Sequence, residues 1–232
     1  MENLIATLRK SFNSNVTRSL EWRLKQLASL ERLIDENKSE LCEALKHDLN
    51  KSEHETVVME FGIIKNSIVH TRKNLASWMQ PIKVNPIVQA RPLYSTFTQY
   101  QPLGVVLIIG AWNYPYQLTL VPLVGALASG NCAIVKPSEL SAKSSKLLES
   151  LWPKYFDTNT CALVNGGVEE TTELLKHKFD HIFYTGNSTV GKSKCLFIFL
   201  IYSKCNRLIL YSFSNNASSI EIYDTINIGM RW

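Results

Sequence analysis

The sequence predicts an α/β protein in which a doubly wound parallel sheet follows an N-terminal helical region. Over residues 1–80, apolar residues recur mostly at three- and four-residue steps among charges, which is typical of amphipathic helices. From residue 102 onward, short and wholly apolar runs alternate with longer amphipathic segments. Because buried parallel strands read as continuous apolar runs, this alternation predicts strand–helix–strand units with right-handed crossovers.

The helical region, residues 1–80, contains polar breaks at Ser39–Glu40 and at Asp48–Asn50, so we expect more than one helix there. No second type of metal ligand stands beside its histidines at metal-binding spacing, and no metal site is expected. These histidines are His47, His54 and His70.

Residues 81–101 contain Pro81, Pro86 and Pro92, which end the helical region and force extended backbone. The run LYSTFTQY, residues 93–100, is rich in Thr, Tyr and Phe with a two-residue alternation, and it predicts a strand or a hairpin arm. Such an element is either an ordinary edge strand or an oligomerisation arm that pairs with another subunit, and composition does not decide between them.

Residues 102–192 predict a β-α-β-α-β-α-β unit. Gly130 is expected to end its first helix, and Ser138 is expected to cap the second. We expect strands over 104–110, 131–137, 161–167 and 181–186, and helices over 117–130, 138–152 and 168–177.

A glycine-rich turn after the fourth strand has two interpretations. Gly186, Gly191, Lys192 and Ser193 match the phosphate loop of nucleoside triphosphatases, and the same segment matches a dinucleotide-binding turn. A triphosphatase loop is normally followed by the strand that carries its magnesium-binding acid, and little sequence follows Ser193 except a weak run ending in Asp224. The dinucleotide interpretation is therefore favoured.

Two long segments resemble the aldehyde dehydrogenase superfamily, specifically its class 3, fatty-aldehyde-like branch. They are PLGVVLIIGAWNYPYQLTLVPLVGALASGNCAIVKPSELS, residues 102–141, and VNGGVEETTELLKHKFDHIFYTGNSTVGK, residues 164–192. The resemblance covers essentially residues 1–192. It implies a Rossmann-like cofactor domain, NAD or NADP as cofactor, and oxidation of an aldehyde to a carboxylic acid.

The resemblance assigns roles to residues of both segments. It implies that the side-chain amide of Asn113 donates to the oxyanion that forms when a cysteine thiolate attacks the aldehyde. Without the resemblance, Asn113 would be interpreted as a turn residue before Pro115. The cofactor-binding residues that it implies are Lys136 and Glu139 at the ribose hydroxyls and Gly186, Ser188 and Gly191 at the diphosphate.

The resemblance stops near Lys192, and residues 193–232 form a divergent tail. The family's E-L-G-G-K segment with its general-base glutamate is missing from this sequence, and neither Cys195 nor Cys205 stands in a context like that of the family's nucleophile. We interpret the tail as a gene-model or read-through product, with an apolar anchoring tail as the alternative. A comparison of the genomic and spliced reading frames would test this. We expect an open sheet edge, low solubility and no aldehyde oxidation by this chain.

Overall composition indicates which partners and which cellular compartment to expect. A net charge of +5 over 232 residues is mild, so nucleic acid is not an expected partner. Five dispersed cysteines indicate a reducing compartment, the cytoplasm or the cytoplasmic face of the endoplasmic reticulum, and no run is long enough to span a membrane. A non-catalytic fragment that binds nucleotide, or pairs with a second copy or with a full-length subunit, is the alternative function.

Overall fold

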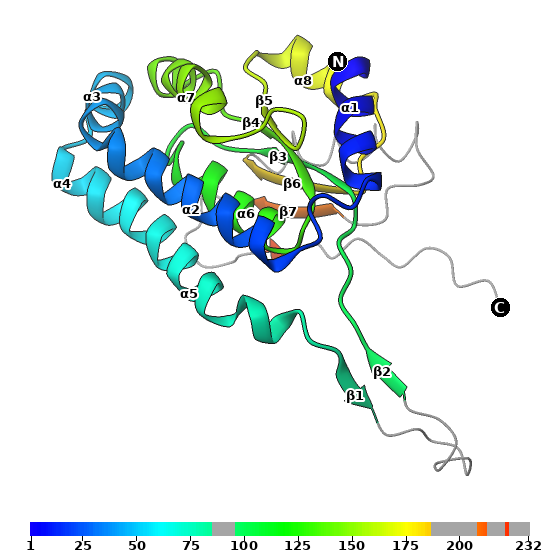
Figure 1. Ribbon diagram of the computed structural model, residues 1–232. Helices are drawn as coiled ribbons and strands as arrows, with labels where there is room; N and C mark the ends of the chain where they lie inside the picture. The colour runs from blue at the N-terminus through cyan, green and yellow to red at the C-terminus, as the bar shows by residue number, and fades with distance from the viewer. Residues whose placement is uncertain (85–95, 187–207, 213–220, 223–232) are drawn as a thin grey trace.

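A computed structural model describes residues 1–84, 96–186, 208–212 and 221–222 of the chain (Figure 1). Its main sheet has six strands in the order β5-β4-β3-β6-β7-β8, and all neighbouring pairs are parallel except β7 and β8. The strands are β3 (Val105–Ile109), β4 (Cys132–Lys136), β5 (Cys161–Leu163), β6 (His181–Gly186), β7 (Leu208–Ser212) and β8 (Glu221–Ile222). The chain first moves outward from β3 and then returns to its other side, so the predicted doubly wound order is confirmed.

Helices cover both faces of this sheet. One face packs on α6 (Gln117–Ala128), α7 (Ala142–Tyr155) and the helices of residues 20–78, through side chains such as Val106 and Ile108 of β3. The other face packs on α1 (Glu2–Asn13) and α8 (Val168–Leu175), through the alternate β3 residues Val105 and Leu107. Because successive strand residues point to opposite faces, a strand buried on both sides must be apolar throughout, as β3 and most of β4 are.

The N-terminal region is helical, as its apolar period predicts. It consists of α1, α2 (Leu20–Glu36), α3 (Lys38–Leu49), α4 (Glu53–Thr56), the π-helix η1 (Val57–Phe61) and α5 (Gly62–Trp78). The hydroxyl of Ser19 caps α2 by accepting from the N–H of Trp22, and Asn50 ends α3 in the left-handed conformation. Since α4, η1 and α5 follow one another without a break, they form one long helical segment that packs beside α2 and α6 (Figure 1).

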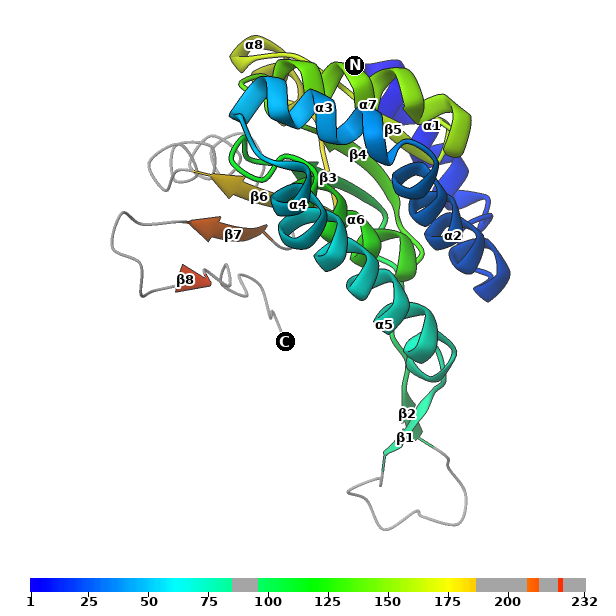
Figure 2. The same ribbon diagram turned by 90° about the vertical axis from the view of Figure 1, so that its left-hand side faces the viewer.

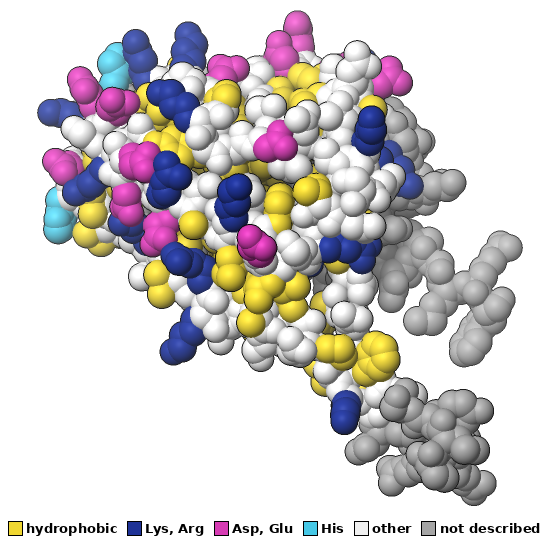
Figure 3. Space-filling view, viewed as in Figure 1, with side chains coloured by type: hydrophobic (Ala, Val, Ile, Leu, Met, Phe, Trp, Pro, Cys, Tyr) yellow, Lys and Arg dark blue, Asp and Glu magenta, His cyan; other side chains and the backbone are white. Residues whose placement is uncertain are grey.

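A two-stranded antiparallel arm projects from the body of the molecule (Figure 2). It is formed by β1 (Ile82–Val84) and β2 (Thr96–Thr98), so the prediction of a strand or hairpin arm is confirmed, with a shorter strand than residues 93–100. Residues 85–95 lie outside the described part of the chain. Hydrophobic side chains gather where the arm leaves the body (Figure 3). On the arm itself, Phe97 of β2 is 58% exposed.

The start of α7 differs from the prediction. Ser138 does not cap this helix, because the helix begins at Ala142 and the Ser138 hydroxyl accepts from the N–H of Leu140 inside a turn, at 3.3 Å. The carboxylate of Asp48, at the end of α3, instead accepts from the N–H groups of Lys143 and Ser144. A side chain that is remote in sequence therefore replaces the local cap.

The divergent tail also differs from the prediction, since the β6 edge of the sheet is not open. Residues 208–212 form β7, which pairs with β6 in parallel from Ile182↔Leu208 to Gly186↔Ser212, and β8 pairs with β7. The physical reason is that LILY, residues 208–211, is a short apolar run of strand-forming residues beside an unsatisfied row of β6 backbone groups. Residues 187–207, between β6 and β7, lie outside the described part of the chain.

Candidate functional site

The carboxyl ends of the parallel strands bring the segments with predicted site residues to one edge of the sheet. In the register, Ile109 at the end of β3 pairs with both Lys136 of β4 and Tyr184 of β6. The Asn113 loop follows β3, and Lys136 and Gly186 end the strands on either side of it, β4 and β6. All three therefore lie at the edge of the sheet where the strand order reverses, between β3 and β6. In open α/β sheets this is the position where ligands bind.

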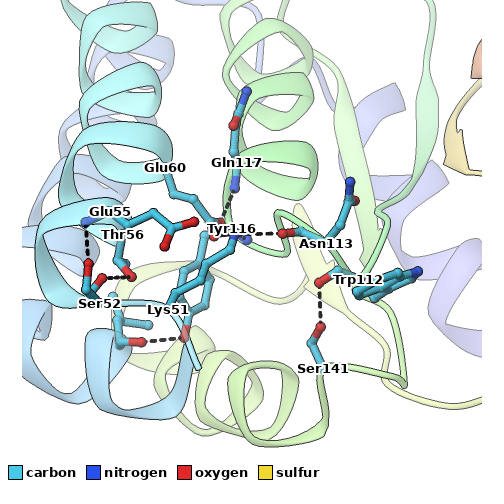
Figure 4. A network of polar contacts seen from close by, with 11 residues as sticks. Lys51, Ser52, Glu55, Thr56, Glu60, Trp112, Asn113, Tyr116, Gln117 and Ser141 are labelled. Atoms are coloured by element: carbon cyan, nitrogen blue, oxygen red, sulfur yellow. Dashed lines mark hydrogen bonds and ion pairs between the residues drawn. The ribbon is translucent and has the colours of Figure 1, made fainter. Parts of the chain in front are cut away.

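Two buried charged residues hold the loop that carries Asn113 (Figure 4). The ammonium of Lys51 donates to Glu60 Oε1 at 2.9 Å and to the backbone oxygen of Asn113 at 2.6 Å. The other carboxylate oxygen of Glu60 accepts from the N–H groups of Tyr116 and Gln117, at 2.9 and 3.1 Å. The side chain of Glu60 is fully buried. The Asn113 side chain points away from this pair (Figure 4).

Neighbouring side chains fix the rest of the loop. The hydroxyl of Ser141 donates to the backbone oxygen of Trp112 at 2.8 Å, and the phenol of the buried Tyr116 donates to the backbone oxygen of Leu41. Burial raises the pKa of the Tyr116 phenol, which stays neutral. Lys51 lies 3.7 Å from the ring centroid of Tyr114, within the range of a cation–π contact. The loop is therefore fixed at several points, while the Trp112 side chain remains half exposed.

Lys136 and Glu139 form a second polar group at the same edge. The ammonium of Lys136 donates to the backbone oxygen of Pro137 at 3.0 Å and to Glu139 Oε2 at 3.2 Å. The Lys136 side chain is only 2% exposed, whereas that of Glu139 is 45% exposed. A buried cation at the end of a strand and a carboxylate that reaches solvent can together bind the hydroxyl groups of a sugar.

The glycine turn is described only at its first residue. Gly186 ends β6, and a Cβ atom there would meet the side chain of Tyr184, so the position requires glycine unless Tyr184 moves. Ser188 and Gly191, the other two residues predicted at the diphosphate, lie outside the described part of the chain. The predicted roles of all three residues stay predictions.

The three described crossover helices already have carboxylates at their N-termini. Glu60 binds the start of α6, Asp48 binds the start of α7, and Glu170 accepts from the N–H of Gly167 at the start of α8, at 2.7 Å. The N–H groups that these carboxylates occupy are therefore not available to an anionic ligand.

The family model for the aldehyde dehydrogenase family matches residues 1–194 of the chain. This chain belongs to the aldehyde dehydrogenase family. It is 47% identical over 194 residues to aldehyde dehydrogenase family 3 member A2 of Pongo abelii, covering 83% of this chain and 39% of that protein. It is 47% identical over 191 residues to family 3 member B1 of Rattus norvegicus, covering 82% of this chain and 41% of that protein. The class 3 prediction is confirmed, and the chain spans about 40% of the length of these relatives.

Solved structures agree with the family membership. Staphylococcus aureus AldH, in a substrate-bound state, superimposes with a TM-score of 0.86 at 34% identity, over 91% of this chain and 45% of that one. NADP-bound GapN of Methanocaldococcus jannaschii superimposes with a TM-score of 0.74 at 20% identity, over 92% of this chain and 46% of that one, and supports the fold alone. The predicted α/β cofactor-domain architecture is thereby confirmed for this aldehyde dehydrogenase chain.

The described thiols of this aldehyde dehydrogenase chain are not activated. Cys42, Cys132 and Cys161 are buried, free thiols, and burial raises the pKa of all three, that of Cys132 to about 12. A thiol with a raised pKa stays protonated and is a poor nucleophile. Cys195 and Cys205 lie outside the described residues. Within the described ranges there is no group of three or more His, Cys, Asp or Glu side chains suited to a metal ion, and no helix long and apolar enough to cross a membrane.

Sequence reasoning missed the residues that hold the site together. Lys51, Glu60, Asp48 and Ser141 were not singled out, because each lies in a polar helical or loop segment where a charge or hydroxyl is ordinary. One signal was present: Glu60 follows the apolar run VVM, residues 57–59, at a position that an amphipathic period turns inward. A buried carboxylate almost always has partners, and here they come from two separate segments, one with Lys51 and one at the start of α6.

Proposed function

We propose that this chain is the cofactor-binding half of an aldehyde dehydrogenase and that it binds NAD or NADP at the carboxyl edge of its sheet. The observation that carries the proposal is that Lys136 and Gly186 end β4 and β6, the two strands beside β3, at the carboxyl edge of the sheet and next to the strand switch point. Lys136 and Glu139 would bind ribose hydroxyls, and Gly186, Ser188 and Gly191 would bind the diphosphate.

When bound, the cofactor supplies the hydride acceptor for oxidation of an aldehyde to an acid. Asn113 would donate its side-chain amide to the oxyanion of that reaction, a contact whose loss from an active enzyme lowers the rate by about 10²- to 10³-fold. The sequence has no counterpart of the family's nucleophilic cysteine or general-base glutamate. We therefore propose that the chain alone binds nucleotide without turning over aldehyde. The three described thiols, which are free and buried, support a reducing compartment such as the cytoplasm.

Lys136→Met tests nucleotide binding. The variant removes a buried cation while keeping an unbranched side chain, so we expect the affinity for NAD and NADP, measured by isothermal titration calorimetry, to fall by roughly 10- to 100-fold. Lys146→Met, an exposed lysine on α7, is the matched control and should bind like the wild type. Tight binding of ATP that requires magnesium and is lost in Lys192→Ala would instead support a triphosphatase.

The exposed arm supports a second candidate function, which is pairing with a second copy or with a full-length subunit. Ile82, Val84 and Phe97 are each about half exposed on a two-stranded sheet that no third strand joins within the described residues, an arrangement that favours strand addition. If the arm pairs, the tagged chain should retain a co-expressed full-length class 3 subunit on a column, and Phe97→Asp should abolish that retention. Equal recovery with wild type and variant would contradict this function.

A further inference from the structure

The Lys51–Glu60 ion pair is the strongest feature of this fold without an assigned role. Its two side chains are 10% and 0% exposed. Moving two charges out of water is costly, and a well-packed apolar pair of similar size is often at least as stable. Burial alone therefore does not indicate that the pair serves only to stabilise the fold. Its contacts with the backbone around Asn113 indicate a further role.

The contacts of the pair converge on the backbone around Asn113. Lys51 has three contacts: the Glu60 carboxylate, the backbone oxygen of Asn113 and the ring face of Tyr114. Both carboxylate oxygens of Glu60 are used as well, one by Lys51 and the other by the backbone N–H groups of Tyr116 and Gln117. The backbone is consequently fixed at Asn113 itself and three residues later, at the start of α6.

The helix that carries Glu60 has an unusual local form. Val57–Phe61 is a π-helix between the α-helical segments α4 and α5. A π-helical turn inserts an extra residue and rotates the following side chains, and such turns are frequent at functional sites. Here the turn coincides with the inward placing of Glu60, while Val58 and Met59 of the same turn are exposed.

We propose that Lys51 and Glu60 are positioning residues that set the direction of the Asn113 side-chain amide. The inference rests on the proposed function, in which that amide binds an oxyanion. The pair holds the main chain of Asn113, and the side chain is left pointing away from both charges (Figure 4). Because the ion pair has no net charge, it adds little field of its own, and the amide of Asn113 remains available as a neutral, directed donor.

The test uses the complete chain labelled with ¹⁵N, with the side-chain amide signal of Asn113 identified by its loss in Asn113→Asp. In the double variant Lys51→Met, Glu60→Gln, buried charge is removed from both partners, so the fold should persist while the contact to the Asn113 oxygen is lost. We expect that signal to shift or broaden, and the backbone amides of Tyr116 and Gln117 to exchange with solvent roughly tenfold faster. In Lys51→Arg, which can still donate to Glu60 and to Asn113, both readouts should return toward the wild type.

Lys38→Met is the matched control, because it breaks the exposed Lys38–Glu53 ion pair of the same helical region and should leave both readouts unchanged. Unchanged Asn113, Tyr116 and Gln117 signals in a folded double variant would overturn the proposal. Equally faster exchange at Ile134 of β4 would also overturn it, since that result indicates only a global loss of stability. Should the double variant not fold, Lys51→Met alone, in which the contact to the Asn113 oxygen is also lost, is read in the same way at mildly acidic pH, where protonation of Glu60 removes its buried charge. Nucleotide titration of the wild type is independent of these NMR readouts. If the wild type does not bind NAD or NADP, the proposed function is wrong, and the NMR result still decides whether the pair positions Asn113.

Discussion

Purified chain with residues 1–232 is expected to show no aldehyde-dependent reduction of NAD or NADP. A family member needs an activated thiolate and a general base, and loss of a covalent nucleophile lowers enzymatic rates by roughly 10⁶-fold. Burial raises the pKa of each described thiol, so none of Cys42, Cys132 and Cys161 is a thiolate near neutral pH. The measurement is NADH or NADPH absorbance with a long-chain and an aromatic aldehyde.

Two controls make this result informative. A full-length class 3 relative, assayed in parallel, shows that the aldehydes and the cofactor are competent. Nucleotide titration of the same chain shows that the cofactor site has folded. Saturable turnover by the chain would contradict the prediction, and Cys195→Ser and Cys205→Ser would then show whether a tail thiol acts as the nucleophile. Turnover that survives both substitutions would show that the reaction does not require Cys195 or Cys205 as its nucleophile.

The sequence predicted the sheet well because its strands are determined locally. Runs such as residues 105–109 are apolar at every position, and a strand that is buried on both faces leaves no other pattern to interpret. The arm was likewise predictable, since Pro81 and Pro92 exclude helix from its surroundings. In each case the physical cause lies within a few residues of its effect.

The predictions that were wrong concern partners that are remote in sequence. Ser138 is a reasonable local cap, but Asp48 reaches the α7 N-terminus from α3, and no short-range pattern predicts that approach. Strand β7 was missed for a different reason. The divergent composition of residues 193–232 indicated that family resemblance had ended, yet pairing with β6 requires only a short apolar run with free backbone groups. The end of the family resemblance therefore did not exclude a further strand in the same sheet.

Lys51→Met is expected to lower the free energy of unfolding by about 3–5 kcal/mol near neutral pH, because it leaves the Glu60 carboxylate buried without its cation. Equilibrium urea denaturation measures this loss. Adding Glu60→Gln should restore most of it, since the buried charge is gone and a neutral amide, although a weaker acceptor for the start of α6, needs no cation beside it. Lys38→Met, which breaks the exposed pair with Glu53, should change stability by no more than about 1 kcal/mol.

The dependence of this loss on pH separates electrostatics from packing. Desolvation raises the pKa of Glu60 in the folded protein, and the Lys51 ammonium opposes that rise, so Lys51→Met should raise the pKa further. A carboxyl group with a raised folded pKa binds more protons when folded. Its contribution to stability is therefore fully present below the unfolded pKa of about 4.3 and is lost as the pH rises through the folded pKa. The deficit of Lys51→Met should thus be small near the unfolded pKa and grow toward neutral pH, whereas a deficit that is constant with pH would mean that the lysine stem, and not its charge, stabilises the loop.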